Sequence, residues 1–202
     1  MKGYEYTKYK TKNPVVQKLI ERFFRRVARV IKDLEFSKVL DAGCGDGEAL
    51  VKLRSMLPDT KNIIGADLDA DQINSARMRE PEITFEVCDL KQLPYKDDQF
   101  DLVLSLEVLE HISNPEQVLK ELVRVSSKYI ILSVPHEPIF MIGNLLRGKN
   151  IAHLGNDPQH INHWGLRSFH RFISGYIDVI SVSSSFPWLI AIGKKRNSLG
   201  LR

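Results

Sequence analysis

Apolar residues recur along the chain with two different spacings, and segments of the two kinds alternate. After the pair Asn13-Pro14, which is typical of a helix start, apolar residues recur every three or four positions as far as Leu34. Further on, short and nearly continuous apolar runs, typical of buried parallel strands, are separated by segments with helical spacing. We therefore predict an α/β protein. The predicted strands are 38–42, 62–67, 83–87, 100–106, 129–134, 176–183 and 188–193, and the predicted helices are 14–34, 47–57, 70–78, one from 115, 139–146 and 166–174.

The composition is that of one globular domain. The chain has 202 residues, of which 43% are apolar and 27% charged, and this length can bury one substantial core. No apolar run is long enough to span a membrane, and the segment Met1–Glu5 lacks the features of a signal peptide. Cys44 and Cys88 both fall in predicted loops, so we expect a disulfide-free cytoplasmic protein. The net charge of +4 permits an anionic partner without requiring one.

Three glycines at alternate positions, Gly43, Gly45 and Gly47, join the first predicted strand to the next helix. A strand, a tight turn and a helix start are how a nucleotide-binding α/β unit begins, because a ligand must lie against bare backbone there. A dinucleotide fingerprint needs its third glycine where Glu48 stands, and no Lys-Ser or Lys-Thr pair follows, which excludes a P-loop. The loop suits a nucleoside without a phosphate, and Asp41 is placed to accept a hydrogen bond from a cationic amine.

The segment 41–47, Asp-Ala-Gly-Cys-Gly-Asp-Gly, resembles motif I of the class I S-adenosylmethionine-dependent methyltransferases, and the likeness extends from about 39 to 135. This resemblance implies S-adenosylmethionine as cofactor and S-adenosylhomocysteine as product. It also implies a doubly wound, Rossmann-like sheet of seven strands, the last antiparallel, with helices on both faces. We expect one domain over 1–202, with a tail and basic amphipathic helix (1–35), a cofactor-binding core (36–135), and an acceptor loop and C-terminal hairpin (136–202).

The candidate cofactor-binding residues follow successive predicted strands. Asp67 stands about twenty residues after the glycine loop, where an acidic side chain binds ribose hydroxyls in βαβ nucleotide sites. Asp67 could instead cap the next helix, although Asp69 and Asp71 are equally suited to that task. The resemblance implies that Asp89 faces the adenine amino group; the alternative is a turn-forming Asp. The full set of cofactor-binding candidates is Asp41, Gly43, Cys44, Gly45, Asp67, Leu68, Asp89, Leu90, Leu106 and Glu107.

The segment Glu107–Ile112 resembles the corresponding part of the ubiquinone-biosynthesis-like small-molecule methyltransferases. The likeness implies that Leu106 and Glu107 pass close to the methionine part of the cofactor. His111 is a candidate general base, with a packing histidine as the alternative interpretation.

Residues 135–164 form a long segment beyond the fifth predicted strand, at the edge of the sheet where ligands bind. An apolar run followed by several histidines suits the acceptor side of a pocket, and we predict that His136 and His163 act on the acceptor together with His111. Glu137 and His160 are further candidates for orienting the acceptor or transferring a proton. The spacing of His160 and His163 raises the possibility of zinc, but no third ligand stands at a firm spacing, and we predict no metal site.

The acceptor is predicted from what the sequence lacks. After the fourth strand stands Ser105-Leu106-Glu107-Val108 in place of the Asn-Pro-Pro-Tyr type tetrad of amino-methylating nucleic acid enzymes, and no Pro-Cys nucleophile is present. We therefore predict methyl transfer to an O, N or C nucleophile of a small molecule, sugar or lipid head group. The alternatives are an RNA methyltransferase and a non-catalytic cofactor-binding scaffold or sensor. One stripe of the first helix is either a solvated face or a contact for anionic lipid or RNA; it comprises Arg22, Arg25, Arg26 and Arg29.

Overall fold

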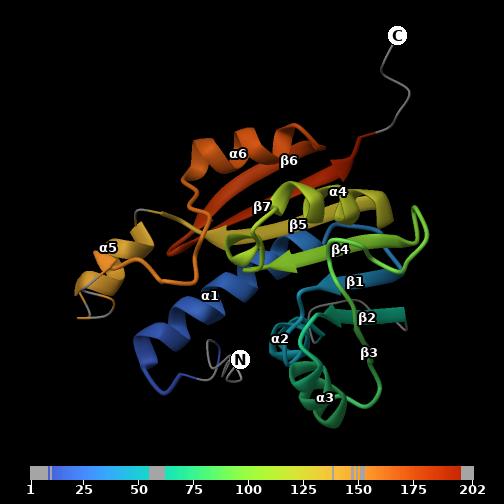
Figure 1. Cartoon of the computed structure of the whole chain (residues 1–202), viewed down its shortest axis with the longest axis horizontal. Helices are drawn as coiled ribbons and strands as arrows, with labels where there is room; N and C mark the ends of the chain where they lie inside the picture. Colours follow the sequence, from blue (N-terminus) through green and yellow to red (C-terminus); the bar gives the residue numbers. More distant parts are fainter. Residues whose placement is uncertain are drawn as a thin grey trace.

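The computed structural model describes residues 9, 11–54, 62–137, 139–146, 148, 150 and 153–196, and its centre is one seven-stranded sheet (Figure 1). The strands lie in the order β3-β2-β1-β4-β5-β7-β6. Strand β7 is antiparallel to both of its neighbours, and the other pairs are parallel. The predicted doubly wound sheet with an antiparallel last strand is therefore confirmed. The strands are β1 (Lys38–Ala42), β2 (Asn62–Asp67), β3 (Thr84–Val87), β4 (Phe100–Leu106), β5 (Ser126–Pro135), β6 (Ile177–Ser185) and β7 (Trp188–Lys195).

Side-chain caps begin three of the helices where the sequence predicts them. The Asn13 side chain accepts hydrogen bonds from two backbone N–H groups at the start of the first helix, and Asp69 and Asn114 cap two later helices in the same way. One short 3₁₀ turn, η1, was not predicted. The helices are α1 (Pro14–Ile31), α2 (Glu48–Arg54), α3 (Ala70–Arg79), η1 (Leu109–His111), α4 (Pro115–Val125), α5 (Ile139–Leu146) and α6 (Leu166–Ser174).

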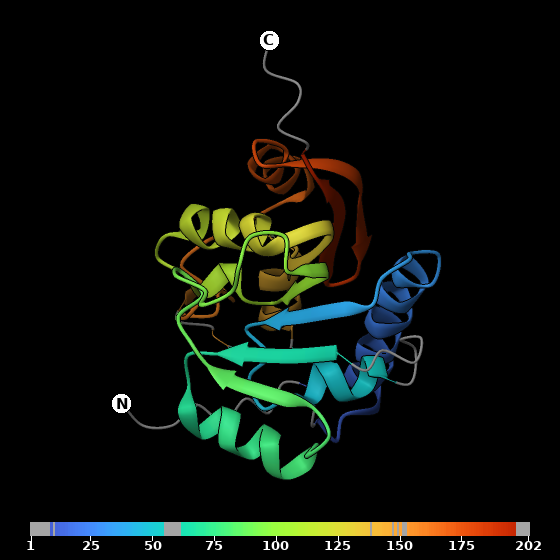
Figure 2. The same ribbon diagram turned by 90° about the vertical axis from the view of Figure 1, so that its right-hand side faces the viewer.

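Two apolar cores lie on opposite faces of the sheet. Figure 2 shows, from the side, that helices cover both faces. Successive strand residues point to opposite faces, so Leu102 and Leu104 of β4 face α1, α2 and α3, whereas Val103 faces α4 and α6. Each of these three side chains is fully buried, and each such burial stabilises the fold by about 1.5–3 kcal/mol. The strands are therefore buried on both faces, which explains their continuous apolar runs.

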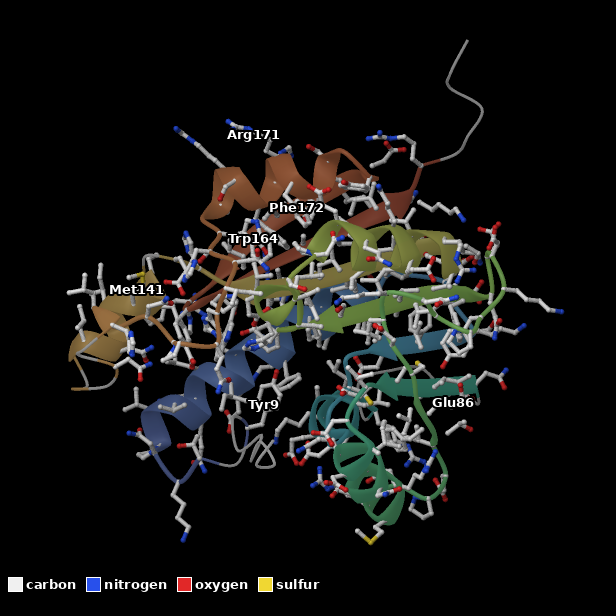
Figure 3. All side chains as sticks on the ribbon, viewed as in Figure 1. Tyr9, Glu86, Met141, Trp164, Arg171 and Phe172 are labelled. Atoms are coloured by element: carbon white, nitrogen blue, oxygen red, sulfur yellow. The ribbon has the colours of Figure 1, made fainter. Side chains whose placement is uncertain are left out.

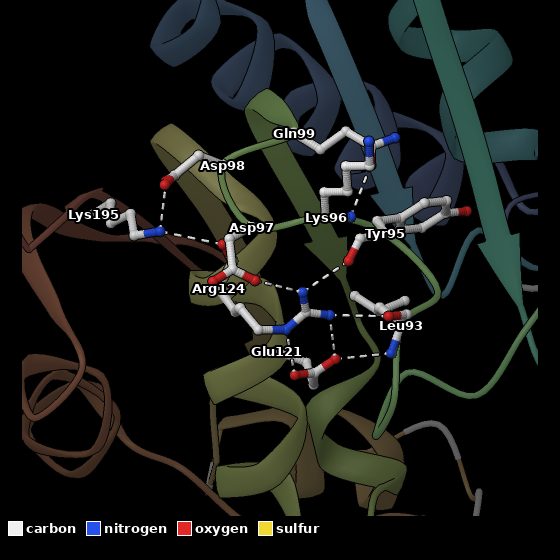
Figure 4. A network of polar contacts seen from close by, with 9 residues as sticks. All are labelled: Leu93, Tyr95, Lys96, Asp97, Asp98, Gln99, Glu121, Arg124 and Lys195. Carbon is white, nitrogen blue, oxygen red and sulfur yellow. Dashed lines mark hydrogen bonds and ion pairs between the residues drawn. The ribbon is translucent and has the colours of Figure 1, made fainter.

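Polar networks hold the edge of the sheet opposite the strands' carboxyl ends. The Arg124 guanidinium binds the carboxylate of Glu121 and the backbone oxygens of Leu93 and Tyr95 (Figure 4). The hydrogen bond from Arg124 lowers the pKa of Glu121. Beside this network Asp101 accepts hydrogen bonds from Ser37 and Lys38, in the segment that enters β1. Partial burial raises the pKa of Asp101, but the hydrogen bonds outweigh it and lower the pKa to about 2.

Some predicted features fall outside the described residues. Helix α2 is described to Arg54, and the rest of the predicted helix 47–57 lies outside the described residues. Of the predicted N-terminal tail, residues 1–8 and 10 lie outside the described residues, and so do residues 197–202. The Tyr9 ring packs edge-on against Phe24 of α1, with 5.2 Å between ring centroids (Figure 3). Among the described residues, no helix has the length and apolar character needed to cross a bilayer.

Candidate active site

The glycine loop lies at the carboxyl end of β1 and is fixed to β2 by backbone hydrogen bonds. The N–H groups of Gly43 and Cys44 donate to the carbonyl oxygen of Ala66 at 2.7 and 3.1 Å. Gly43 and Gly45 both have positive φ, 85° and 53°. A Cβ on Gly43 would lie 2.3 Å from a methyl carbon of Val108, whereas a Cβ on Gly45 would meet open space. The loop therefore presents bare backbone to an open region at Gly45, as a closely bound ligand requires.

Asp41 is a buried carboxylate at the carboxyl end of β1, with 2% of its surface exposed. Its Oδ2 atom has no hydrogen-bond donor among the described residues. Burial, and then the negative charge of Asp67, raise the pKa of Asp41 from 3.8 to about 7. A buried carboxylate without a donor is costly, and a ligand's ammonium group would offset that cost. The site therefore fits the amine of an amino acid moiety.

Asp67 connects the ends of β1 and β2. Its Oδ2 accepts a hydrogen bond from the N–H of Gly45 at 2.8 Å, and its Oδ1 accepts one from Asp69 at 3.0 Å. Asp69 caps α3, as the sequence predicts, so Asp67 is not needed there. Each carboxylate oxygen can accept a second hydrogen bond, so the same side chain can fix the loop and bind ribose hydroxyls. The ribose contact remains a prediction.

The predicted adenine side of the site follows β3. The side chain of Asp89 is exposed and accepts a hydrogen bond from the N–H of Lys91 at 2.9 Å, which is the turn-forming role named as its alternative. Leu90 is buried, whereas Leu68 is 67% exposed. Burial raises the pKa of both Cys44 and Cys88, so both side chains stay neutral thiols at neutral pH. The contacts predicted for these residues stay predictions.

Glu107 has an unusual backbone at the carboxyl end of β4. Its φ of 62° lies in the left-handed region, which costs a residue other than glycine about 1–3 kcal/mol. Hydrogen bonds maintain this conformation, because its N–H donates to the carbonyl oxygen of Ser133 and its Oε1 accepts from the Ser133 hydroxyl, both at 3.0 Å. The side chain is 3% exposed, and the preceding Leu106 is also buried. Strain of this kind is typical of ligand sites.

The three predicted catalytic histidines have different environments. The His111 ring packs against the ring of His160, with 5.1 Å between centroids, whereas Nε2 of His163 lies 2.8 Å from Oδ1 of Asn156 in an exposed position. His136 extends β5, and its Nδ1 lies 3.5 Å from the hydroxyl of Ser184. Among the described residues no hydrogen bond or ring contact joins any two of the three. Their joint action on an acceptor remains a prediction.

Sequence reasoning overlooked Glu110. This side chain is fully buried in η1, directly beside His111, and the loop that carries His160 folds back over it. The available signal was the pair Glu110-His111 directly after Val108 and Leu109, because a carboxylate buried beside apolar residues is rarely retained without a cationic or hydrogen-bonding neighbour.

A groove of about 710 Å³ lies between α1 and β6, away from the glycine loop. Arg25 forms an exposed ion pair with Glu21 at 3.0 Å, and Nε of Arg26 lies 3.5 Å from the Ser183 hydroxyl. The predicted arginine stripe therefore forms one wall of a groove rather than a uniformly solvated face. The groove is lined by Val15, Lys18, Leu19, Arg22, Arg25, Arg26, Arg29, Ser184 and Ser185.

Comparison with known proteins finds a methyltransferase domain in the chain. Residues 40–129 match the family model described as a methyltransferase domain. Norajmaline N-methyltransferase of Rauvolfia serpentina is 35% identical over 105 residues, which cover 48% of this chain and 36% of that protein. Demethylmenaquinone methyltransferase of Lactobacillus johnsonii is 31% identical over 134 residues, covering 61% of this chain and 53% of that protein.

Solved structures show the same fold over nearly the whole chain. A SAM-dependent methyltransferase from Aquifex aeolicus superposes with a TM-score of 0.73 at 16% identity, covering 96% of this chain and all of that one. The matched domain covers a little less than half of the chain, and together with the strand order and the motif it supports a class I S-adenosylmethionine-dependent methyltransferase. The chain spans only about a third to a half of the length of the two curated relatives.

Proposed function

We propose that the chain transfers the methyl group of S-adenosylmethionine to a small-molecule acceptor. One observation carries this proposal: the backbone of Gly45 faces open space and its N–H donates to the partly buried carboxylate of Asp67, while the buried carboxylate of Asp41 lies at the carboxyl end of the adjacent strand β1. These groups match an amino acid amine and a ribose, with no phosphate between them. The curated relatives named above are methyltransferases of small molecules by their names, which supports this class of acceptor.

The residues that would hold the cofactor follow the ends of β1 to β4. Asp41 would accept from the amine, the backbone of Gly43 to Gly45 would lie against the nucleoside, and Asp67 would accept from the ribose. When bound, the cofactor supplies a methyl group that its sulfonium makes electrophilic. The chain's own task is then to align a nucleophile, exclude water and, for a hydroxyl acceptor, accept its proton. His136 and His163, in the segment predicted to form the acceptor side, are the candidate bases for that proton.

The experiment is a cofactor and turnover test on the full chain. Calorimetry should show S-adenosylmethionine and S-adenosylhomocysteine binding at one site per chain, with NADH and ATP unable to compete. Fractions of small metabolites should then be incubated with the protein and labelled S-adenosylmethionine, with product S-adenosylhomocysteine measured. Cofactor binding without turnover on any fraction would favour the scaffold or sensor alternative, and NADH or ATP binding would contradict the cofactor class.

The arginine groove favours one second candidate, an acceptor that carries phosphate groups, such as RNA. Its cationic wall includes Lys18, Arg22 and Arg29, which form no ion pair with any described residue. Phosphate contacts made by such side chains weaken steeply with salt. Retention of the protein on single-stranded or transfer RNA at about 0.15 M salt, lost in Arg22→Ala/Arg29→Ala, would support this candidate. Equal retention of the variant, or none at all, would contradict it.

A further inference from the structure

Two histidines and a glutamate meet outside the cofactor-binding residues. One ligand atom from each of Glu110, His111 and His160 lies within 4.8 Å of the other two. Glu110 is fully buried, His160 is 6% exposed and His111 is partly buried. Ionisable side chains are seldom gathered in the interior unless a partner or an ion compensates their burial. The three residue types and their mutual distances are those of a metal-ligand set.

Backbone hydrogen bonds build this cluster from segments about fifty residues apart. The N–H groups of Ile161 and Asn162 both donate to the carbonyl oxygen of Glu110, at 2.9 and 3.1 Å. The Asn162 side-chain amide donates to the carbonyl oxygens of Leu109 and Ile112 at 2.9 and 2.7 Å. Asn162 thus holds the loop against η1 without using either histidine. The frame that places the two imidazoles is therefore made by the backbone and by Asn162.

A backbone carbonyl fixes the tautomer of His111. Its Nδ1 lies 3.1 Å from the carbonyl oxygen of Gln159, which can only accept a hydrogen bond. In the neutral ring the proton therefore stays on Nδ1, and Nε2 keeps its lone pair. That Nε2 lies 3.8 Å from Oε1 of Glu110. Metal-binding histidines commonly have this arrangement, in which a carbonyl or carboxylate holds the second ring nitrogen.

His160 has a carboxylate partner. Its Nδ1 has no hydrogen bond to any described residue and lies 3.6 Å from Oε1 of Glu137, an oxygen that likewise has none. Both side chains are more than nine-tenths buried. If Oε1 of Glu137 moved closer to Nδ1 of His160, the two would form a hydrogen-bonded carboxylate–histidine pair. Nε2 of His160 could then bind an ion. The second oxygen of Glu137 accepts from the N–H of Met141, which ties the carboxylate to the start of α5 (Figure 3 labels Met141).

We propose that Glu110, His111 and His160 bind a divalent transition-metal ion, with Glu137 orienting His160. Two imidazoles and one carboxylate suit zinc, manganese, iron(II) or cobalt, and not calcium, which takes oxygen ligands. Bonds of about 2.0–2.2 Å to a metal bring ligand atoms about 3–4 Å apart, so the side chains close by about 1 Å on binding. This proposal replaces the expectation of no metal, which rested on the lack of a third ligand at a firm spacing. Two of the three ligands, Glu110 and His111, come from η1, far away from His160 in sequence, and His163 is not among them.

Three protein ligands leave coordination positions open, as in catalytic metal sites. The cluster follows β4 and β5 at their carboxyl ends, on the side proposed for the acceptor. Resting on the proposed methyl transfer, we infer that the ion takes an oxygen of the acceptor as a further ligand and lowers the pKa of that hydroxyl. The hydroxyl proton leaves to solvent or a nearby base, the oxygen–carbon bond forms, and the carbon–sulfur bond breaks. The acceptor class that fits is therefore a hydroxyl compound.

The test begins with the metal alone. The full chain, treated with chelator and exchanged into metal-free buffer, is titrated with ZnCl₂ and separately with MnCl₂ in a calorimeter. We expect one ion per chain, a higher melting temperature with metal, and at least a tenfold loss of affinity in His111→Ala and His160→Ala. Glu137→Gln should lose about tenfold, since it removes only the orienting carboxylate. His170→Ala removes an exposed histidine of α6 and should bind as the unchanged protein does.

A second measurement needs no variant. Substoichiometric Mn²⁺ should broaden the ring-proton NMR signals of His111 and His160 and leave those of His170 sharp. Uniform broadening of all histidines, or no saturable binding up to millimolar metal, would overturn the site. Unchanged affinity in both His111→Ala and His160→Ala would overturn it as well. Calorimetry with S-adenosylhomocysteine reports the cofactor site separately, so failure of the metal proposal and failure of the methyltransferase proposal give different results.

Discussion

The two halves of the sheet's carboxyl edge are built in different ways. At the ends of β1 and β2 the site is mostly backbone, shaped by glycines with positive φ and tied down by Asp67. At the ends of β4 and β5 it is mostly side chains, held by a returning loop that donates to Glu110. At Gly43 the backbone has no room for a Cβ, whereas the side chains at the ends of β4 and β5 can be shortened without a clash. Mutation of Gly43 should therefore lower stability, and mutations at the ends of β4 and β5 should mainly lower activity.

The largest effect is expected for Gly43→Ala. Its Cβ would lie 2.3 Å from Val108, and the residue would have to keep a φ of 85°. Overpacking and left-handed strain together should lower the free energy of unfolding by about 3–5 kcal/mol. Urea denaturation measures this change. Gly45→Ala is the matched control, because it meets no atom and should cost only about 1 kcal/mol of strain. Equal losses in the two variants would contradict a packing role for Gly43.

Asp41→Asn should stabilise the protein in a pH-dependent manner. Because the pKa of Asp41 rises from 3.8 to about 7 on folding, the folded protein holds a proton that the unfolded chain releases between these values. As far as Asp41 alone is concerned, the protein is therefore most stable below about pH 4, where Asp41 is protonated in both states, and the free energy of unfolding falls as the pH rises from there to about 7. Asn removes this loss, so the variant should gain up to about 4 kcal/mol at pH 8 and little near pH 4.

Urea denaturation of Asp41→Asn and the unchanged protein at both pH values measures this difference. The same variant should bind S-adenosylhomocysteine more weakly at pH 8, because an amide carries no charge for the ligand's ammonium group. A stability difference that does not change with pH would show that Asp41 does not titrate in this range.

Asp67→Ala should weaken cofactor binding by about 3 kcal/mol if two charge-assisted hydrogen bonds to the ribose are lost. The variant also removes the acceptor for the N–H of Gly45, so some stability is lost with it. Calorimetry with S-adenosylhomocysteine measures the affinity. Asp71→Ala, an exposed neighbour that does not cap α3, should leave binding unchanged. Unchanged affinity in Asp67→Ala would refute the ribose assignment.

The smallest effect is expected on the acceptor side. His136→Ala and His163→Ala should each slow turnover about tenfold, or 1.4 kcal/mol of barrier, with cofactor affinity and melting temperature nearly unchanged. Both side chains make contacts that are weak or exposed, which supports a small effect on stability. Turnover measured on an identified acceptor tests this. If both variants turn over normally, His136 and His163 do not act on the acceptor, and the segment 135–164 has only a structural role.

The sequence by itself determined the strands, the α-helices and the glycine loop at the end of β1. Apolar spacing is a local property, and the need for glycine at a positive φ is set by the residue itself, so the loop at Gly43 and Gly45 can be predicted from the sequence. The sequence left Asp67, Asp69 and Asp71 as possible caps of α3, and the structure selects Asp69.

At the ends of β4 and β5, only the tertiary structure decided which residues lie together. No sequence pattern predicts the left-handed backbone of Glu107, which is maintained by Ser133. Nor does any pattern predict that Glu110 lies close to His160. Such contacts depend on how a long connection closes onto the sheet, and loop closure carries little sequence preference of its own. The arginine stripe was visible as a helical pattern, but its groove appeared only once β6 packed beside α1. Local preference fixes elements, and packing between distant segments fixes which side chains share a site.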